Sequence, residues 1–375
     1  MPPNASRGRP RSCTMMSADG GTIPIRNVYA LLAYAWNWLD LAPIADVSAI
    51  EADTPADLLA RLLADGLGTL LRRGPYRAYI ERVEDLRQPR GAVDVTPTVT
   101  GALRARGRVV CRFDELSYDV VENRVIKAAA RALFACRGID RRLALKLRDA
   151  YVRMDEVADV ELSAELLRRA RVPRGHHLYG MLLDVCRLVF ENLLPDESGN
   201  GMRLRDFTRD DRQMAHLFEA FVRGFLKRHL EDARVGREHL GWFGAAGERA
   251  ALNLLPRMET DVSVRTPRHC AIVETKFVRQ PFRKLEGNAR LKLRSEHLYQ
   301  LFAYVKNTHD RGAGSHTIDG ILLYASVGRG VSETLALGDS RVSVQTLDLL
   351  ACWADIRDAL LALPVRRSAM PTVAV

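Results

Sequence analysis

The sequence lacks both the cysteine pairs of a zinc site and the phosphate-binding loop of a nucleotide hydrolase. Its six cysteines are scattered over 375 residues without a CxxC pair, and no His/Cys spacing suggests zinc. This usage predicts reduced, buried thiols in a cytoplasmic protein. No GxxxxGK[ST] motif occurs, so we expect this chain to bind no nucleotide itself. If its function needs nucleotide hydrolysis, a partner must supply it.

Long apolar runs are also missing. The most apolar early stretch, VYALLAYAWNWL, is too short to span a bilayer and follows no signal-peptide n-region, so no membrane association is expected. Apolar residues make up 47% and charged residues 27% of the chain, which is ordinary for a globular protein. The formal net charge of +10 is a mild bias towards anionic partners, nucleic acid first.

The length favours two domains and the composition shifts mark their limits. Residues 1–22 are rich in Pro, Gly, Ser and Arg and are predicted to be a disordered extension. Residues 23–172 are predicted to form an N-terminal α+β domain. Residues 173–375 mix strands and helices and are predicted to form an α/β domain.

Within the N-terminal domain, an apolar helix rich in aromatic residues at 28–38 is expected to be buried against its own domain or a partner. Residues 55–72 are predicted to form an amphipathic helix. Residues 76–113 show an alternating pattern that is interrupted by Pro and Gly. This pattern predicts short strands in a small β-barrel or curled sheet. A long helix then follows, with Ser117 as a possible N-cap.

The segment METDVSVRTPRHCAIVETKF, residues 258–277, predicts a β-hairpin that carries acids on its strands. Antiparallel pairing about the TPRH turn sets Asp261 opposite Glu274, and alternation puts Glu274 and Lys276 on one face. Two close carboxylates repel each other and are costly to bury, whereas a bound Mg²⁺ would relieve that cost. Lys276 could then act on the attacking water or on charge developing at a phosphate. An ordinary exposed hairpin face is the alternative.

Basic side chains follow the hairpin, with a single acid, Glu286, among them. Such a group beside a metal site suits a phosphodiester backbone, and a solvated charged loop is the alternative. The predicted DNA-binding residues are Arg279, Arg283, Lys284, Arg290, Lys292 and Arg294.

Two helices offer supporting residues. Gln300 and Tyr304 are i,i+4 neighbours, with His297 on the same side, so Gln300 could bind a phosphate or the water. Glu219 lies at the edge of an apolar stripe and could reach the metal site as a third carboxylate. A surface glutamine and a solvent-facing acid are the alternatives. A further acidic cluster is interpreted as helix-start acids or contacts within the N-terminal domain, in preference to a second metal site: Asp114, Glu115, Asp119 and Glu122.

The order of these motifs resembles the core of PD-(D/E)XK nucleases: a helix acid, a T-D in one strand, E-T-K in the next and a helix glutamine. The blocks IPIRNVYALLAYAW, DELSYDVVENRVIKAAARAL, MAHLFEAFV, LLPRMETDVSV, IVETKF and YQLFAY together resemble the McrC family. That family is the nuclease subunit of modification-dependent McrBC restriction systems. The resemblance runs from about residue 23 to beyond residue 330.

The resemblance implies a restriction-endonuclease-like C-terminal core, with a mixed sheet flanked by helices. It makes Asp261 and Glu274 ligands of Mg²⁺, with Mn²⁺ as a substitute, and Lys276 the catalytic lysine; Glu219 and Gln300 become supporting residues. It also implies an McrB-like AAA+ GTPase ring as partner, engaged and stimulated by the N-terminal domain. The implied substrate is double-stranded DNA that contains modified cytosine, and the setting is phage defence in the bacterial cytoplasm.

Two other functions remain open at this level. One is a non-catalytic activator of the GTPase ring, which would be expected to carry a broken acid and lysine set. The other is a stand-alone PD-(D/E)XK repair nuclease, which would cut without a GTPase and would leave the aromatic-rich helix unexplained.

Overall fold

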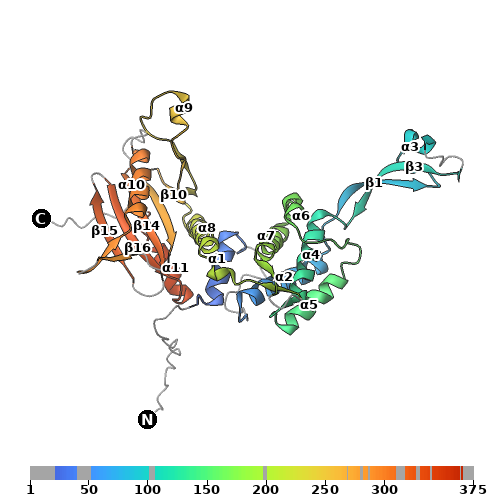
Figure 1. Ribbon diagram of the computed structural model, residues 1–375, viewed down its shortest axis with the longest axis horizontal. Helices are drawn as coiled ribbons and strands as arrows, with labels where there is room; N and C mark the ends of the chain where they lie inside the picture. The colour runs from blue at the N-terminus through green and yellow to red at the C-terminus, as the bar shows by residue number, and fades with distance from the viewer. Residues whose placement is uncertain are drawn as a thin grey trace, which may run out of the picture.

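The computed structural model describes residues 22–39, 52–100, 106–196, 201–267, 269–278, 282–285, 288–309, 317–326, 330–337, 340–363 and 365. Side chains at 282–291, 309 and 317 lie outside this description. The predicted disordered extension therefore lies outside the described residues, apart from Thr22. Figure 1 shows an elongated molecule, with a sheet and its helices at one end, a body of helices in the middle and a projecting arm at the other end.

The C-terminal half is built on one mixed sheet, so the expected α/β sheet flanked by helices is confirmed. Its strands run in the order β15-β16-β14-β11-β10-β7; β11, β14 and β16 are parallel to one another, and the other pairs are antiparallel. Their bounds are β7 (Arg234–Gly236), β10 (Val262–Arg265), β11 (His269–Phe277), β14 (Thr317–Ser326), β15 (Ser332–Leu337) and β16 (Ser340–Asp348).

Helices cover both faces of this sheet because alternate residues of its central strands are apolar on each side. Val273 and Ile321 pack in the core that includes α8 (Asp211–His229) and α11 (Trp353–Leu361). Ile272 and Leu322 pack instead with α10 (Ser295–His309). The smaller elements of this half are η3 (Phe207–Arg209), β8 (His239–Leu240), α9 (Arg249–Leu252), β9 (Met258–Glu259), β12 (Phe282–Leu285) and β13 (Asn288–Leu293).

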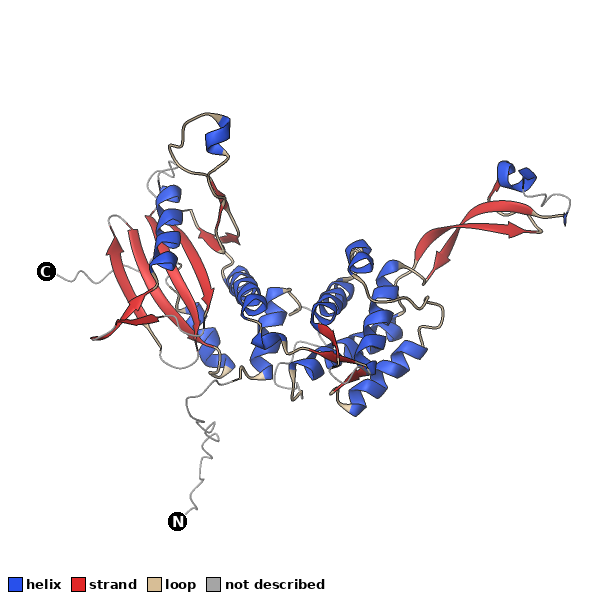
Figure 2. Cartoon of the chain, viewed as in Figure 1, coloured by secondary structure: helices blue, strands red, loops and turns tan. Residues whose placement is uncertain are grey.

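The middle of the molecule is a helical body, and Figure 2 shows most of the strands lying beyond it at the two ends. Thr54 caps the predicted second helix, and its side chain accepts from the amide of Asp57. Helix α7 (His177–Asn192) packs against α2 (Pro55–Arg73) and α4 (Val121–Ala135), although α7 follows the domain boundary expected near residue 173. The other bounds are β4 (Cys136–Arg137), α5 (Arg141–Val152), α6 (Ala164–Arg169), β5 (Leu193–Pro195) and β6 (Met202–Leu204).

Of the two alternatives expected for residues 76–113, the described part of the arm shows an open sheet and not a small β-barrel, and it also corrects the expected N-cap. Its strands β1 (Ala78–Leu86), β3 (Val109–Ser117) and β2 (Ala92–Asp94) form an antiparallel sheet, joined by α3 (Val95–Thr100), and no closed barrel forms among the described residues. Two long strands and one short one cannot close on themselves. Ser117 is not the N-cap of α4: it ends β3 opposite Ala78, and the helix begins four residues later because FDELS completes the ladder with β1.

The aromatic-rich helix α1 (Ile25–Ala35) is buried by the C-terminal half of its own chain. The Asn27 side chain donates to the carbonyl oxygens of Leu349 (2.8 Å) and Ala351 (2.9 Å). The Tyr34 ring lies 5.1 Å from that of Phe225 in α8. The first helix of the chain is therefore packed on its C-terminal half. No helix in the described ranges combines the length and apolar character needed to cross a membrane.

Candidate active site

The hairpin has the register that the sequence predicts. Strands β10 and β11 pair from Val262 opposite Val273 to Arg265 opposite Cys270, so one further step sets Asp261 opposite Glu274. Asp261 directly precedes β10, and its Oδ2 accepts hydrogen bonds from the Thr275 amide and hydroxyl, each at 2.8 Å. The carboxylate is thus held against β11 beside Glu274.

Glu274, Lys276 and Gln300 form a connected chain of hydrogen bonds. Lys276 Nζ lies 2.7 Å from Glu274 Oε1 and donates to Gln300 Oε1 at 3.0 Å. The Gln300 amide in turn donates to Tyr304 Oη at 3.0 Å, one helical turn along α10. His297, expected on the same side, contacts Tyr324 Oη instead. The structure therefore brings the predicted acids, lysine and glutamine together, from two strands and one helix.

The two acids lie in an environment that favours a bound cation. Burial, followed by the charge of Asp261, raises the pKa of Glu274 to about 7, although Lys276 lowers it. Burial also raises the pKa of Asp261. Glu274 is 1% exposed, and its Oε2 is buried without a hydrogen-bond partner among the residues that the structure describes. A buried polar atom without a partner is costly, and oxygen is the ligand that Mg²⁺ prefers, so this donor set fits the expected metal.

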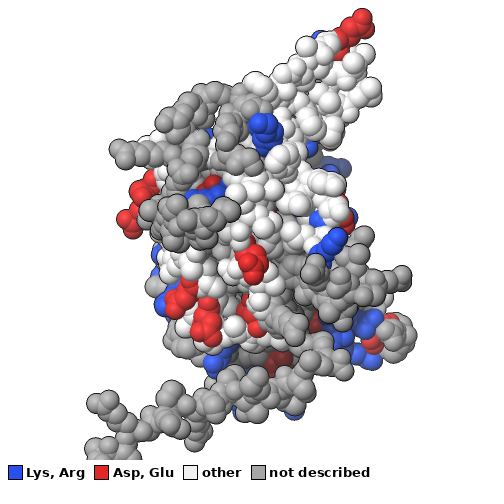
Figure 3. All heavy atoms as spheres, turned by 90° about the vertical axis from the view of Figure 1, so that its left-hand side faces the viewer, with Lys and Arg blue, Asp and Glu red and all other residues white. Residues whose placement is uncertain are grey.

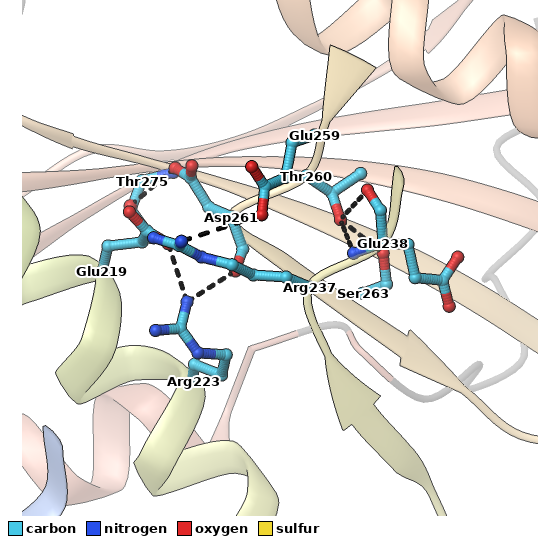
Figure 4. A network of polar contacts seen from close by, with 9 residues as sticks. All are labelled: Glu219, Arg223, Arg237, Glu238, Glu259, Thr260, Asp261, Ser263 and Thr275. Atoms are coloured by element: carbon cyan, nitrogen blue, oxygen red, sulfur yellow. Dashed lines mark hydrogen bonds and ion pairs between the residues drawn. The ribbon is translucent and has the colours of Figure 1, made fainter. Parts of the chain in front are cut away.

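Glu219 lies in α8, and its carboxylate accepts hydrogen bonds from two arginines (Figure 4). Its Oε1 accepts from Arg223 Nη1 at 2.7 Å and from Arg237 Nε at 2.6 Å. Arg223 Nη1 also donates to the main-chain oxygen of Asp261 at 3.1 Å. Over the described residues, no three His, Cys, Asp or Glu side chains are grouped so as to hold a metal ion. Besides burial, the charge of Glu219 nevertheless raises the pKa of both Asp261 and Glu274, so the role of Glu219 as a third carboxylate stays a prediction.

The sequence interpretation missed Thr275, Arg223 and Arg237. Arg223 could have been found, since it is the i+4 neighbour of Glu219 on a predicted helix. Thr275 is adjacent to Glu274 in the strand, so its side chain faces the other side of β11. Its role depends on its hydrogen bonds to Asp261, which the strand pattern alone does not predict. Arg237 follows an edge strand and carries no sequence signal.

The basic segment after the hairpin forms a ribbon of two strands, β12 and β13, with Arg283 opposite Lys292. Lys292 is exposed, and Arg294 lies 3.8 Å from Glu296. Figure 3 shows the outer face of the end of the molecule that holds the mixed sheet. The coloured Lys and Arg side chains on this face are scattered and do not form one continuous basic patch. Arg279 lies outside the described residues, as do the side chains of Arg283, Lys284 and Arg290.

The acidic cluster near the start of α4 makes structural contacts. Asp119 accepts from Arg124 Nε (2.7 Å) and from the Ala158 amide (2.9 Å). Glu122 accepts from the amide of Arg171 at 2.8 Å. For these two acids, the contacts agree with the interpretation that the cluster makes contacts within the N-terminal part of the chain.

Three comparisons bear on the family. A family model for McrBC 5-methylcytosine restriction system components matches residues 31–325. The Escherichia coli (strain K12) protein "Type IV methyl-directed restriction enzyme EcoKMcrBC" is 28% identical over 339 residues, which cover 90% of this chain and 96% of that protein. The fold is also similar to that of a chain in a solved structure, the refined half-complex from a tetradecameric assembly of Thermococcus gammatolerans McrB AAA+ hexamers with bound McrC. The TM-score is 0.53 at 16% identity, and the match covers 90% of this chain and 75% of that chain.

The family match covers well over half of the sequence and includes the hairpin, α8 and α10. The resemblance that the sequence motifs indicate is therefore confirmed. The chain belongs to the McrBC 5-methylcytosine restriction system component family.

Proposed function

We propose that this chain is the Mg²⁺-dependent endonuclease subunit of a McrBC-type restriction complex. Its substrate would be double-stranded DNA that contains modified cytosine such as methylcytosine, and the reaction would be hydrolysis of a phosphodiester. The observation that carries the proposal is the buried, partnerless Oε2 of Glu274, which lies in a site shared with Asp261 and Lys276. A purely structural ion pair would not need to leave that oxygen without a partner.

Each residue has a role that follows from its contacts. Asp261 and Glu274 would hold Mg²⁺, with Mn²⁺ as a substitute, and the metal would polarise the phosphate and lower the pKa of water. Thr275 fixes Asp261 through two hydrogen bonds. Lys276 is held by Glu274 and Gln300, which places its ammonium group to orient water or to stabilise charge on the phosphate.

The proposed partner is an McrB-like AAA+ GTPase ring. The chain has no phosphate-binding loop of its own, and a half-complex of McrB hexamers with McrC shares its fold. The arm lies at the far end of the molecule from the sheet (Figure 1) and exposes Tyr79 (73%) and Val83 (55%). Exposed apolar side chains on a projecting element suit protein contact. We propose that the arm engages the ring and stimulates GTP hydrolysis.

DNA would lie along the basic ribbon next to the site. Its cations can neutralise backbone phosphates without reading sequence, so the modified base would be recognised by the partner. The residues proposed for this contact are Arg279, Arg283, Lys284, Arg290, Lys292 and Arg294. The proposed setting is the bacterial cytoplasm.

The test is cleavage of methylated DNA by the chain together with its GTPase partner, GTP and Mg²⁺. Asp261→Ala and Lys276→Ala are each expected to abolish cutting, while Asp261→Ala still stimulates GTP hydrolysis. In the arm, Tyr79→Asp is expected to lower that stimulation, with Tyr79→Phe as the matched control. Unimpaired cutting by Asp261→Ala or Lys276→Ala would refute the nuclease assignment.

The two rival functions make different predictions in the same assay. A non-catalytic activator would stimulate GTP hydrolysis without cutting DNA, and the intact set of Asp261, Glu274 and Lys276 argues against it. A stand-alone nuclease would cut without the GTPase. The burial of α1 by its own chain removes one objection to that rival, so cleavage with and without the partner is the deciding comparison.

A further inference from the structure

Arg237 lies beside the candidate site. One edge of its guanidinium is bound to Glu219, and the other edge makes no short hydrogen bond to the described residues. Its Nε donates to Glu219 Oε1 at 2.6 Å, and its Nη2 contacts the same oxygen. Its Nη1 lies 3.7 Å from Glu259 Oε1, which is an ion pair but too long for a hydrogen bond. The N–H groups of Nη1 therefore remain able to donate to a ligand, and the side chain is 44% exposed.

We infer that Arg237 is a substrate-binding residue that contacts a phosphodiester oxygen, and that Glu219 serves this arginine and not the metal. The inference rests on the proposed function, since it names a further residue for the same reaction. Figure 4 shows the arginine reaching from the end of β7 towards Glu219, beside Asp261. Although burial opposes the charged form, the charge of Asp261 raises the pKa of Arg237, so the guanidinium lies within electrostatic range of that hairpin acid.

The arrangement suits a phosphate because the cation is positioned in advance. A guanidinium is planar, keeps its charge and matches the oxygens of a phosphate with parallel N–H groups. Burial opposes the charged form, yet the hydrogen bond to Glu219 and the neighbouring carboxylates raise the pKa of Arg237. A fixed cation that need not reorganise stabilises the charge that develops on a phosphate during hydrolysis.

Arg223 shows what a purely structural arginine looks like at the same site. Its side chain is only 23% exposed, and its Nη1 bridges Glu219 Oε1 and the main-chain oxygen of Asp261. Arg223 thus fixes α8 to the start of β10 and positions Asp261 through the backbone. The greater exposure of Arg237 separates the two roles.

Glu219 is poorly suited to bind a metal in this arrangement. Both guanidiniums donate to its Oε1, and these charge-assisted hydrogen bonds offset the negative charge that a metal ligand would offer. Among the described residues, the Asp261 carboxylate accepts only from the neutral donors of Thr275, and Glu274 accepts from a single cation, Lys276. Glu219 is therefore a positioning residue, which acts on the substrate through Arg237.

The first test replaces Arg237 in the full chain and measures cleavage with the GTPase partner. Arg237→Ala is expected to lower the cleavage rate about 10²-fold, in the range seen when one fixed donor to a developing charge is removed. Arg237→Lys should recover part of that loss, since it keeps the charge but not the planar fork. The matched control is Arg234→Ala in β7, an exposed arginine three residues away, which should cleave at the normal rate.

The second test separates substrate binding from metal binding. Glu219→Gln is expected to slow cleavage while Mn²⁺ binding to the DNA-free protein, measured by calorimetry, stays unchanged. If Glu219 acts through Arg237, the double variant should be no slower than Arg237→Ala alone. Weakened Mn²⁺ binding by Glu219→Gln would overturn the positioning role and restore the acid as a metal ligand.

The outcomes also separate this inference from the function on which it rests. If the unaltered chain and partner cleave DNA but Arg237→Ala cleaves within about twofold of the normal rate, the inference fails and the nuclease assignment stands. If the unaltered pair cleaves nothing, the nuclease assignment itself fails. Unfolding temperatures that match across the variants guard against simple loss of fold, and Arg237→Lys keeps the test valid if the alanine variant does not fold.

Discussion

Lys276 Nζ lies 2.7 Å from Glu274 Oε1, and this contact satisfies only one oxygen of a carboxylate that is almost fully buried. The other oxygen, Oε2, has no hydrogen-bond partner in the described part of the chain. Removing a charge from water is costly unless the ion is fully paired, so the single lysine contact leaves the carboxyl group only partly stabilised. The Glu274 carboxyl group would therefore be further stabilised either by taking up a proton or by binding a cation.

Metal affinity should consequently depend on pH near neutrality. The pKa of Glu274 is raised to about 7, so below that pH a proton competes with the metal for the carboxylate. We expect Mn²⁺ affinity to fall by up to about tenfold for each pH unit below 7, with proton release on binding. Calorimetry at pH 5.5 and pH 8, in buffers of different ionisation enthalpy, measures both effects.

Glu274→Gln is the control for this experiment and should lose both the binding and the proton release. Equal Mn²⁺ affinity at the two pH values in the unaltered protein would contradict the role given to Glu274.

The same carboxyl group should make the metal-free protein less stable as pH rises. The pKa of about 7 in the folded protein exceeds the ordinary glutamate pKa of 4.5, so the native state binds this proton more tightly than the unfolded state. The contribution is fully present below pH 4.5 and is lost as pH rises to 7, a change of about 3 kcal/mol at about 1.4 kcal/mol per pKa unit. Urea unfolding in EDTA at pH 5 and pH 8 should show it.

Glu274→Gln isolates this contribution because glutamine does not titrate. The variant is expected to gain stability relative to the unaltered protein between pH 5 and pH 8. A difference between the two proteins that is the same at both pH values would show that Glu274 ionises normally.

Thr275 should matter to catalysis although it lies outside the expected motif. Its hydroxyl and amide both donate to Asp261 Oδ2 at 2.8 Å, and Thr275→Val removes the hydroxyl at nearly constant volume. We expect cleavage to fall about tenfold, the effect of roughly 1.4 kcal/mol of lost orientation at a metal ligand. Thr275→Ser keeps the hydroxyl and should cleave nearly normally. If Thr275→Val also cleaves normally, the backbone contact alone orients Asp261.

The core of the candidate site could be predicted because its geometry is local. A short turn fixes the pairing of Asp261 and Glu274, strand alternation adds Lys276, and helical spacing joins Gln300 to Tyr304. The Arg237–Glu219 contact could not be predicted in this way. It joins the end of an edge strand to a helix, and no periodicity relates the two positions.

The fold shows the same division between local and long-range information. Apolar content predicted that α1 is buried but not what buries it, since Asn27 bonds to Leu349, more than three hundred residues along the chain. The strands of the arm were expected from alternation and turn residues. Whether they close into a barrel depends on pairing between distant strand edges, which alternation does not specify.

The packing of α1 on the C-terminal domain predicts a sharp difference between two glycines. A Cβ at Gly224 in α8 would fall 2.1 Å from the main-chain oxygen of Tyr34, and backbone cannot move aside as a flexible side chain can. Gly224→Ala is therefore expected to destabilise the protein by about 3 kcal/mol, as overpacking of a close contact does. Gly180→Ala in α7 is the matched control: its nearest neighbour would be 3.8 Å away, so alanine should stabilise by about 0.5–1 kcal/mol through helix propensity. Urea unfolding of both variants measures the difference, and stabilisation by Gly224→Ala would mean that α1 does not pack on α8 at this point.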